Sequence, residues 1–291
     1  MKDVVITHPE KVLFPDDGIT KADLAAYYEM IAPLMLPHIL GRPVTLERFN
    51  RGIGEKGIFQ KNVVKGFPSW LQRVAVPKKD GTVHHPIVTD ARSLLWLANQ
   101  NSITPHVWTS RAPKVMYPDV CVFDLDPSDA NRKRLRGAAL LLRDFLKELG
   151  LESWLKTSGS KGFHIAVPLD GKSDYQTVAR FAHAVGAAVV RRDPKNLTGE
   201  FYKKDRGKRV LVDTGRNEYS ATFAAAYAVR PRPGAPVSAP CTWEELETAT
   251  VTPTSFTLRN MRARVAGVGD LWAEMLERRQ SLRKPIAGLP V

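Results

Sequence analysis

The apolar and polar positions of this chain repeat with two different periods, which predicts a fold that mixes helices with strands. Apolar residues recur every three or four positions in residues 131–149 and 175–190, and both stretches are predicted to be amphipathic helices. Residues 44–49 alternate with a period of two, and residues 210–213 form a short apolar run, so both are predicted to be strands.

One short run, Cys-Val-Phe-Asp-Leu-Asp-Pro at residues 121–127, is a predicted buried strand that ends on two acids. Side chains alternate between the two faces of a strand, so Asp124 and Asp126 share one face, with Cα atoms roughly 7 Å apart. Carboxylates at this spacing can hold one or two hard cations such as Mg²⁺ or Mn²⁺. Pro127 cannot continue the ladder and ends the strand. The alternative interpretation is that the acids only cap the helix that follows.

Two glycine-containing motifs in the first third of the chain are interpreted as turns. Residues 52–57 match G-x-G-x-x-G, but the residues that follow lack the helical periodicity that a dinucleotide-binding loop requires. Residues 78–81, Lys-Lys-Asp-Gly, resemble the start of a DNA ligase nucleotidylation motif, but Asp-Gly between alternating residues favours a hairpin. Both motifs are therefore predicted to connect neighbouring strands.

A helix is predicted to begin after Thr20, which has a residue type favoured at the N-cap. The start of a helix presents backbone N–H groups, and Lys21 adds a positive charge there. Lys11, in the preceding loop, could close over the same place. The two lysines could therefore bind an anion; the alternative is that both are solvated surface residues.

A loop of small residues, Thr-Ser-Gly-Ser-Lys-Gly at residues 157–162, lies between two predicted strands. Lys161, His164 and the backbone N–H groups of the loop are suited to binding a triphosphate. The spacing and the strand that follows exclude a Walker loop. The alternatives are that Lys161 is a solvated loop lysine and that His164 is a hydrogen-bonded histidine on a half-buried strand.

The charge balance favours a polyanionic partner. The 291 residues include 43 Lys and Arg against 30 Asp and Glu, a net charge of +13 at pH 7, and each phosphate neutralised by such a surface releases counterions. Nucleic acid is the first expectation, and a generically basic surface is the alternative. Two cysteines, no apolar run of membrane-spanning length and no signal peptide predict a protein of the reducing cytoplasm that does not contact membranes.

A third acid, Asp213, ends the predicted strand of residues 210–213. Two metal ions need carboxylates that converge from different strands, and Asp124, Asp126 and Asp213 can supply them. The alternative is that Asp213 caps the Thr-Gly turn that follows it. Simple nucleic-acid binding would not need the acids, and a nuclease would not need a triphosphate-binding loop. Acids, loop and positive charge together predict nucleotidyl transfer.

Three motifs in this order resemble those of archaeo-eukaryotic primase-superfamily polymerases: Asp124-x-Asp126, Ser158-Gly-x-Lys161-Gly-x-His164, and the strand that ends in Asp213. More closely, the chain resembles the polymerase domain of bacterial ligase D, which takes part in non-homologous end joining. The resemblance covers nearly the whole chain, from residues 11–15 to the segment around Trp243. No nuclease or ligase module accompanies it, so we expect an excised domain or a stand-alone relative.

The resemblance implies an α/β (α+β) fold, a two-lobed primase-polymerase core built on mainly antiparallel sheets flanked by helices. Residues 1–291 would form a single primase-polymerase domain. Its N-terminal lobe would cover about residues 1–110, its catalytic core about residues 111–245, and a C-terminal helical region about residues 246–291.

The resemblance also implies the catalytic residues and the cofactors. Two divalent cations, Mn²⁺ or Mg²⁺, would be held by three carboxylates: Asp124, Asp126 and Asp213. The first two acids would bridge both ions, and the third would lie nearer the primer 3′-OH. These three acids would therefore be both the metal ligands and the catalytic residues.

Further residues are implied to bind the substrates. The nucleotide would be held by residues from several segments: Ser158, Lys161, His164, Arg230 and His106. Lys11 and Lys21 would bind a 5′-phosphate at a DNA gap or break. Phe59 would stack on the template, as base–aromatic contacts allow. The Ser158 hydroxyl is expected to contact the ribose.

The implied function is template-directed addition of NTPs and dNTPs to a primer 3′-OH at DNA gaps or breaks that carry a 5′-phosphate. The expected partners are such DNA, a DNA-end-binding protein and a ligase, in the cytoplasm and at the nucleoid. Two alternatives stay open: a primase that starts chains without a primer, and a non-catalytic module that binds 5′-phosphorylated ends. The two lysines weaken the first alternative, and the three acids weaken the second.

Overall fold

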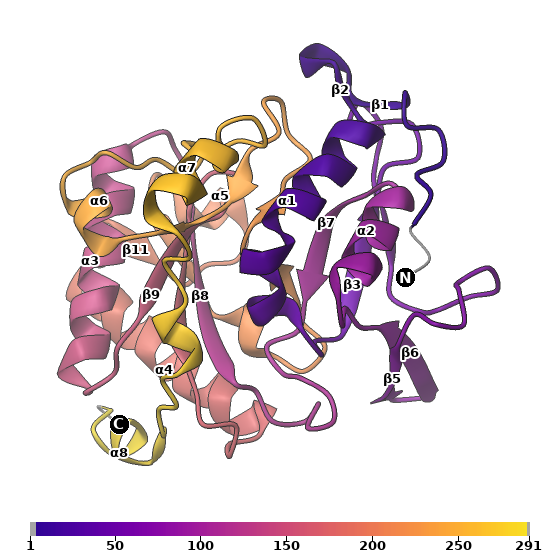
Figure 1. The fold of residues 1–291 in the computed structure, drawn as a ribbon. Helices are drawn as coiled ribbons and strands as arrows, with labels where there is room; N and C mark the ends of the chain where they lie inside the picture. The colour runs from indigo at the N-terminus through magenta and orange to yellow at the C-terminus, as the bar shows by residue number, and fades with distance from the viewer. Residues whose placement is uncertain (1–3, 290–291) are drawn as a thin grey trace. The chain divides into compact units, whose positions relative to one another are not determined.

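The computed structural model describes residues 4–289, which divide into two compact units. Unit 1 contains the residues up to 115 together with residues 222–239 and 256–270. Unit 2 contains residues 116–221 and 240–255 and the residues from 271 onward. Every sheet lies within one unit (Figure 1).

Unit 2 is built on a sheet of six strands in the order β11-β12-β8-β10-β9-β16. The strands are β8 (Val120–Pro127), β9 (Trp154–Thr157), β10 (Phe163–Pro168), β11 (Leu197–Thr198), β12 (Val210–Asp213) and β16 (Pro240–Cys241). All neighbouring pairs are antiparallel except β11 and β12. The predicted mixed fold with mainly antiparallel sheets is therefore confirmed.

Two amphipathic helices, α3 (Arg132–Glu148) and α4 (Tyr175–Arg192), contact each other and β8 (Figure 1). The periodicity of the sequence predicts both helices correctly. Gly186 of α4 lies against Val212, and a Cβ at this glycine would meet the Thr214 side chain at 2.8 Å. Val212 is the register partner of Leu125 on β8. The helices therefore cover the Leu125 face of the sheet, and the acids of β8 point to the opposite face. Shorter helices of unit 2 are α5 (Lys203–Arg206) and α6 (Trp243–Glu247).

Unit 1 contains a four-stranded antiparallel sheet in the order β13-β7-β3-β4. Its strands are β3 (Val44–Arg48), β4 (Ile58–Gln60), β7 (Ser102–Val107) and β13 (Phe223–Ala224). Three two-stranded ladders join β1 (Val12–Phe14) to β2 (Ile19–Thr20), β5 (Arg73–Lys78) to β6 (Gly81–Pro86), and β14 (Ala228–Val229) to β15 (Val237–Ser238). Both glycine motifs connect antiparallel strands, as predicted.

Helices α1 (Lys21–Ile39) and α2 (Ala91–Asn99) pack against each other in unit 1. The predicted start of α1 is confirmed, because the Thr20 side chain accepts a hydrogen bond from the Asp23 N–H, and Asp23 in turn accepts from the Thr20 N–H. This reciprocal capping satisfies two backbone donors that a helix start leaves unpaired.

The resemblance implies a C-terminal helical region, and the structure divides this part of the chain into short pieces. They are α7 (Met261–Val268) in unit 1, and η3 (Glu274–Leu276) and α8 (Arg283–Ala287) in unit 2. Gly269 ends α7 with φ of 65°, a left-handed value that glycine adopts readily. Among residues 4–289, no helix combines the length and the apolar character needed to cross a membrane.

Candidate active site

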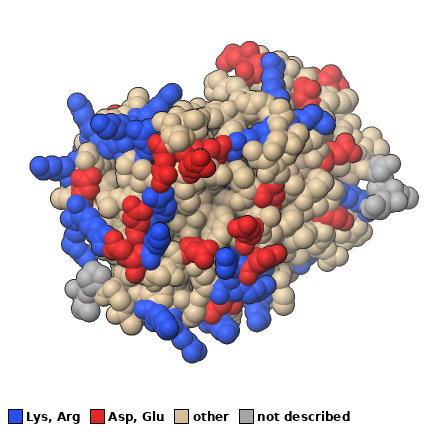
Figure 2. All heavy atoms as spheres, turned by 60° about the vertical axis from the view of Figure 1, so that its left-hand side comes forward, with Lys and Arg blue, Asp and Glu red and all other residues tan. Residues whose placement is uncertain are grey.

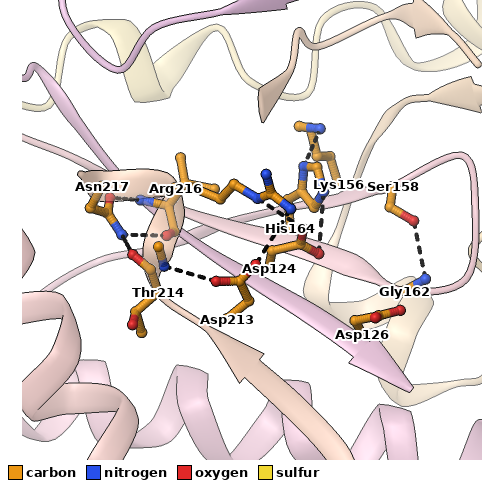
Figure 3. Close-up of polar contacts among 12 residues, drawn as sticks. Asp124, Asp126, Lys156, Ser158, Gly162, His164, Asp213, Thr214, Arg216 and Asn217 are labelled. Carbon is orange, nitrogen blue, oxygen red and sulfur yellow. Dashed lines mark hydrogen bonds and ion pairs between the residues drawn. The ribbon is translucent and has the colours of Figure 1, made fainter. Parts of the chain in front are cut away.

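The three predicted acids, which we call the acid site, lie on two neighbouring strands of unit 2. Asp213, the last residue of β12, is the register partner of Asp124 on β8. Asp126 is two residues further along β8. All three side chains project from the face that α3 and α4 leave uncovered, and Figure 3 shows Asp124 and Asp213 close together. The sequence predicts the shared face of the first two acids, and the register between strands brings in the third.

Arginines hold the acid site in this structure. The Arg216 guanidinium lies 3.4 Å from Asp124 and 3.4 Å from Asp213. Arg206 donates a hydrogen bond of 2.8 Å to Asp126. The two arginines differ in exposure, because the Arg216 side chain is 41% exposed whereas that of Arg206 is buried. An exposed guanidinium is held less tightly, so a second cation can compete for Asp124 and Asp213 more easily than for Asp126.

The electrostatics of the acid site favour additional positive charge. Burial raises the pKa of the Asp124 carboxyl to about 6, Arg216 opposes the rise, and the carboxylates of Asp213 and Asp126 add to it. A carboxylate that is buried among other carboxylates is costly to ionise unless a cation compensates it. The acid site is therefore short of positive charge at neutral pH.

The donor set fits hard divalent cations, which prefer carboxylate oxygens. Within residues 4–289, no three His, Cys, Asp or Glu side chains are already arranged as a metal centre. The arginines explain this, because Arg216 pairs with Asp124 and Asp213 while Asp126 turns to Arg206. The carboxylate oxygens and their uncompensated negative charge suit Mg²⁺ or Mn²⁺. Binding of such an ion would require the contacts of Arg206 and Arg216 to change.

A short turn after β12 fixes where Asp213 and Arg216 lie. Its last residue, Asn217, is fully buried and accepts a hydrogen bond of 2.8 Å from the Val122 N–H. The same side chain donates to the Val122 carbonyl at 2.7 Å. Asn217 thus pairs with β8 as a neighbouring strand would. The turn is held against β8, and Arg216 is placed over the acids (Figure 3).

The small-residue loop lies between β9 and β10, and its shape depends on Ser158. The Ser158 Oγ accepts hydrogen bonds from the N–H groups of Ser160 at 3.1 Å and Gly162 at 3.0 Å. These two amides therefore point into the loop, although the sequence suggested that the loop amides would face a triphosphate. Gly162 lies so close to β8 that a Cβ there would meet the Leu125 carbonyl oxygen at 1.6 Å. The loop is packed directly on the strand that carries the acids.

A buried lysine connects this loop region to the acid site. Lys156, on β9, is fully buried and its Nζ lies 2.7 Å from the His164 Nδ1. The Nε2 of the same imidazole lies 3.5 Å from Asp124 (Figure 3). An ammonium has no acceptor capacity, so Nδ1 accepts and Nε2 carries the proton. The structure thus places His164 beside the acids with a donor directed at them.

Lys161 is exposed and lines a cavity of about 420 Å³ in unit 2. The cavity is bordered by the end of β8 at Pro127, by the start of α3 at Arg132, and by Thr252. Lys161 and Arg132 contribute positive charge to this cavity, and Asp129 also lines it. Its position beside the end of β8 is consistent with the phosphate-binding role that the resemblance implies for Lys161.

Unit 1 gathers three of the other predicted residues. The rings of Phe59 and His106 lie 5.5 Å apart, and the Phe59 side chain is exposed. The His106 Nε2 lies 2.9 Å from the Glu47 carboxylate. Burial would raise the pKa of Glu47, but its hydrogen bond with His106 and the charges of His106 and Arg230 together lower it. Glu47 is therefore ionised within this cluster at neutral pH. Arg230 acts on the same carboxylate.

Lys11 and Lys21 also lie together in unit 1, where the Lys21 N–H donates to the Lys11 carbonyl at 2.8 Å. The Lys21 side chain is buried, and its Nζ donates to the carbonyls of Thr7 at 2.6 Å and Asn99 at 3.1 Å. Burial lowers the pKa of Lys21, and the charge of Lys11 lowers it further. Lys21 is therefore not a solvated surface lysine. Lys11 is half-buried.

Several residues of the site were not identified from the sequence: Lys156, Arg206, Arg216, Asn217 and Glu47. Lys156 gave one usable signal, because a lysine within an apolar strand is costly to bury without a partner. The other residues gave none, since their contacts depend on the conformation of turns and on the register of strands.

Basic side chains are spread over the visible surface. Figure 2 shows Lys and Arg interspersed with Asp and Glu on this face, and no uninterrupted basic patch covers it. Net charge alone therefore does not locate a nucleic-acid path, and local groups of residues must do so.

Comparisons with known proteins identify the family. Residues 20–272 match the family described as LigD, primase-polymerase domain. The chain is 37% identical over 246 residues to the multifunctional non-homologous end joining protein LigD of Mycolicibacterium smegmatis, covering 84% of the chain and 32% of that protein. It is 33% identical over 287 residues to the LigD of Pseudomonas aeruginosa, covering 96% of the chain and 34% of that protein. The chain thus spans about a third of the length of these curated relatives.

A solved structure agrees over almost the whole chain. The polymerase domain of Mycobacterium tuberculosis ligase D in complex with DNA superposes with a TM-score of 0.90 at 32% sequence identity. The alignment covers 96% of this chain and 100% of that one. The family match and these similarities show that the chain belongs to the LigD primase-polymerase domain family.

Proposed function

We propose that this chain is a template-directed nucleotidyltransferase that adds NTPs and dNTPs to a primer 3′-OH at DNA gaps or breaks with a 5′-phosphate. One observation carries the proposal: carboxylates from two paired strands share a sheet face beside His164 and the loop that bears Lys161. The names of the relatives, which are non-homologous end joining proteins, support the same function.

The acid site would hold two divalent cations, Mn²⁺ or Mg²⁺, through Asp124, Asp126 and Asp213. When bound, such ions lower the pKa of the attacking hydroxyl and neutralise charge on the α-phosphate as pyrophosphate leaves. Before they bind, Arg216 and Arg206 partly compensate three half-buried carboxylates that would otherwise face one another without a cation.

The nucleotide would be bound by residues around the small-residue loop. Lys161 contributes an exposed positive charge for the phosphates. His164, held by Lys156, directs an N–H towards Asp124 of the acid site. Ser158 stabilises the loop conformation by accepting hydrogen bonds from two backbone N–H groups, and its hydroxyl hydrogen can contact the nucleotide. Together these groups would orient the α-phosphate for in-line attack.

Residues of unit 1 would recognise DNA and the rest of the nucleotide. Phe59 would stack on the template, and His106 and Arg230 would contact the nucleotide, with Glu47 orienting the imidazole. Lys11 would bind the 5′-phosphate, and Lys21 would support it. We further propose cooperation with a DNA-end-binding protein and a ligase, in the cytoplasm and at the nucleoid.

Three outcomes of one assay separate this function from its alternatives. The protein is incubated with Mn²⁺, labelled NTPs and a 5′-phosphorylated gapped duplex, with and without a primer strand. The proposed polymerase extends only the primed substrate, follows the template, and works better with the 5′-phosphate. Products without a primer would indicate a primase instead. Binding of the phosphorylated gap without any product would indicate a non-catalytic end-binding module.

A further inference from the structure

Unit 2 carries a pair of exposed aromatic side chains, Phe201 and Tyr202, which we call the aromatic pair. They are 68% and 66% exposed, more than any other aromatic residue in the described part of the chain. Their rings lie 5.7 Å apart in an edge-to-face arrangement. Two adjacent rings that contact each other and leave their outer surfaces to solvent are unusual, because burial of such rings is favourable. The arrangement indicates a binding surface.

The chain around the aromatic pair is strongly basic. Residues 200–209 contain five Lys and Arg against two acids. Lys203 and Lys204 follow Tyr202 directly, in α5, and both are exposed. An apolar protein partner would need these charges to be desolvated or paired, whereas a nucleic-acid strand supplies phosphates for the lysines and bases for the rings. The charge therefore favours single-stranded nucleic acid.

The aromatic pair is tied to the acid site through one buried side chain. The Arg206 guanidinium donates to the Asp126 carboxylate at 2.8 Å and to the Glu200 carbonyl at 2.9 Å. It also donates to the Phe201 carbonyl. Because one planar guanidinium makes all three contacts, it positions the backbone of the aromatic pair relative to Asp126 in the cation-free protein. A base stacked on these rings would belong to a strand that runs to the acids.

We propose that the aromatic pair stacks on unpaired bases of the strand whose 3′ end reaches the acid site, and so holds single-stranded primer ends. This inference rests on the proposed function in its choice of strand. The rings supply contacts that every base can make, so the binding is independent of sequence. Such a contact would be useful where the primer end is frayed or overhanging and has no template partner to orient it.

Equilibrium binding without nucleotide tests the proposal. The substrate is a duplex with a 3′ overhang that carries 2-aminopurine, whose fluorescence is quenched by stacking on aromatic rings. The wild-type protein should quench a probe placed in the overhang. The Phe201→Ala/Tyr202→Ala variant should lose the quenching and bind the overhang roughly tenfold more weakly, as expected for the loss of base–aromatic stacking. Affinity for a blunt duplex should be unchanged.

Two further variants make the result specific. Exchanging the rings, Phe201→Tyr with Tyr202→Phe, should retain affinity and quenching. Tyr117→Ala removes another exposed aromatic of unit 2 and should have no effect. Because the aromatic pair is exposed, the melting temperature of the alanine variant should match that of the wild type.

Several results would overturn the proposal: wild-type affinity and quenching in the alanine variant, equal weakening by the ring exchange, or quenching only when the probe lies in the template strand. The titration contains no nucleotide, so its outcome does not depend on whether the chain polymerises. A protein that passes this test and fails to extend primers would contradict the proposed function while leaving the stacking surface in place.

Discussion

Charged side chains are half-buried in the acid site and buried in unit 1, and they are compensated in different ways. In the acid site, Asp124 and Asp213 share one guanidinium, that of Arg216, which is 41% exposed and lies 3.4 Å from each. In unit 1, the buried Lys21 ammonium donates to two backbone carbonyls at 2.6 and 3.1 Å. The carboxylates of the acid site are paired with an exposed side chain that can move away. The Lys21 ammonium is held by backbone carbonyls, which are fixed by the fold.

This difference indicates two roles. The acid site can exchange the Arg216 guanidinium for another cation, whereas Lys21 is a structural residue that fixes the segment around Lys11. Exposed ion pairs contribute little, so the Arg216 contacts can give way to another cation at small cost. Lys21 cannot turn to a ligand without leaving two carbonyls without their partner. We therefore expect Lys11, which is half-buried, to contact a 5′-phosphate and Lys21 to hold Lys11 in place.

The largest expected effect is the loss of nucleotide addition when an acid is removed. Asp124→Ala or Asp126→Ala should reduce single-nucleotide addition at least a thousandfold, because charge stabilisation by bound cations contributes several kcal/mol to the transition state. DNA binding should stay nearly unchanged, as measured by fluorescence anisotropy. Asp129→Ala, which removes an acid paired with Arg134, serves as the control and should stay active. Appreciable extension by either acid-site variant would mean that the cations bind elsewhere.

Removing the same carboxylate charge should stabilise the cation-free protein at neutral pH. The pKa of Asp124 is raised to about 6 from 3.8, so between these values the folded state binds a proton that the unfolded state lacks. The contribution of Asp124 to the free energy of unfolding is therefore greatest below about pH 4 and is lost as the pH rises through 6. At about 1.4 kcal/mol per pKa unit, Asp124→Asn should stabilise the protein by up to roughly 3 kcal/mol at pH 7.5.

Urea unfolding in a chelating buffer at pH 5 and at pH 7.5 measures this difference. The advantage of Asp124→Asn should be clearly smaller at pH 5, where the wild-type carboxyl is mostly protonated. An equal difference at both pH values would show that the carboxylate is already compensated in the folded protein.

The lysines of unit 1 should separate into a binding residue and a structural one. Lys11→Ala should lower the preference for 5′-phosphorylated over 5′-hydroxyl gaps at least tenfold, because a charge-assisted hydrogen bond contributes about 1.5–3 kcal/mol. Lys21→Ala should instead lower the free energy of unfolding by about 1–3 kcal/mol, because the Thr7 and Asn99 carbonyls lose their donor. Binding titrations and urea unfolding of both variants provide the measurements. A stable Lys21→Ala protein with lost phosphate preference would make Lys21 a direct ligand.

The smallest expected effect concerns Ser158. The resemblance suggests that its hydroxyl reads the ribose, in which case Ser158→Ala would impair NTP addition alone. The structure shows that the Ser158 Oγ accepts hydrogen bonds from the N–H groups of Ser160 and Gly162. Ser158→Ala removes these bonds and should destabilise the loop by about 1 kcal/mol, whichever nucleotide is bound. We therefore expect single-nucleotide addition to fall several-fold with both NTPs and dNTPs. Ser160→Ala is the matched control. A loss confined to NTPs would assign sugar recognition to Ser158.

The sequence predicts those parts of the site that follow from local backbone geometry. Asp124 and Asp126 share a face because side chains alternate along any strand, and α3 follows from the helical periodicity of residues 131–149. The two hairpins follow from turn chemistry in the same way.

Other parts of the site depend on long-range pairing, which local patterns do not specify. The pairing of Asp213 with Asp124 requires β12 to lie beside β8 in one register. Arg206 and Arg216 reach the acids only because their turns fold over the sheet face. The sequence predicts Lys21 either as an anion-binding residue or as a solvated lysine, and its burial depends on hydrogen bonds to the distant residues 7 and 99.

The most direct test of the acid site is a titration of Mn²⁺ into the protein, with the free ion followed by electron paramagnetic resonance. The wild-type protein should bind Mn²⁺, and Asp129→Asn, a control outside the acid site, should bind it equally well. Asp124→Asn should lose this binding, because Asp124 lies between Asp126 and Asp213 and its carboxylate is needed to complete the cation site. Mn²⁺ binding of wild-type strength in Asp124→Asn would contradict the central claim that Asp124, Asp126 and Asp213 together form the cation site.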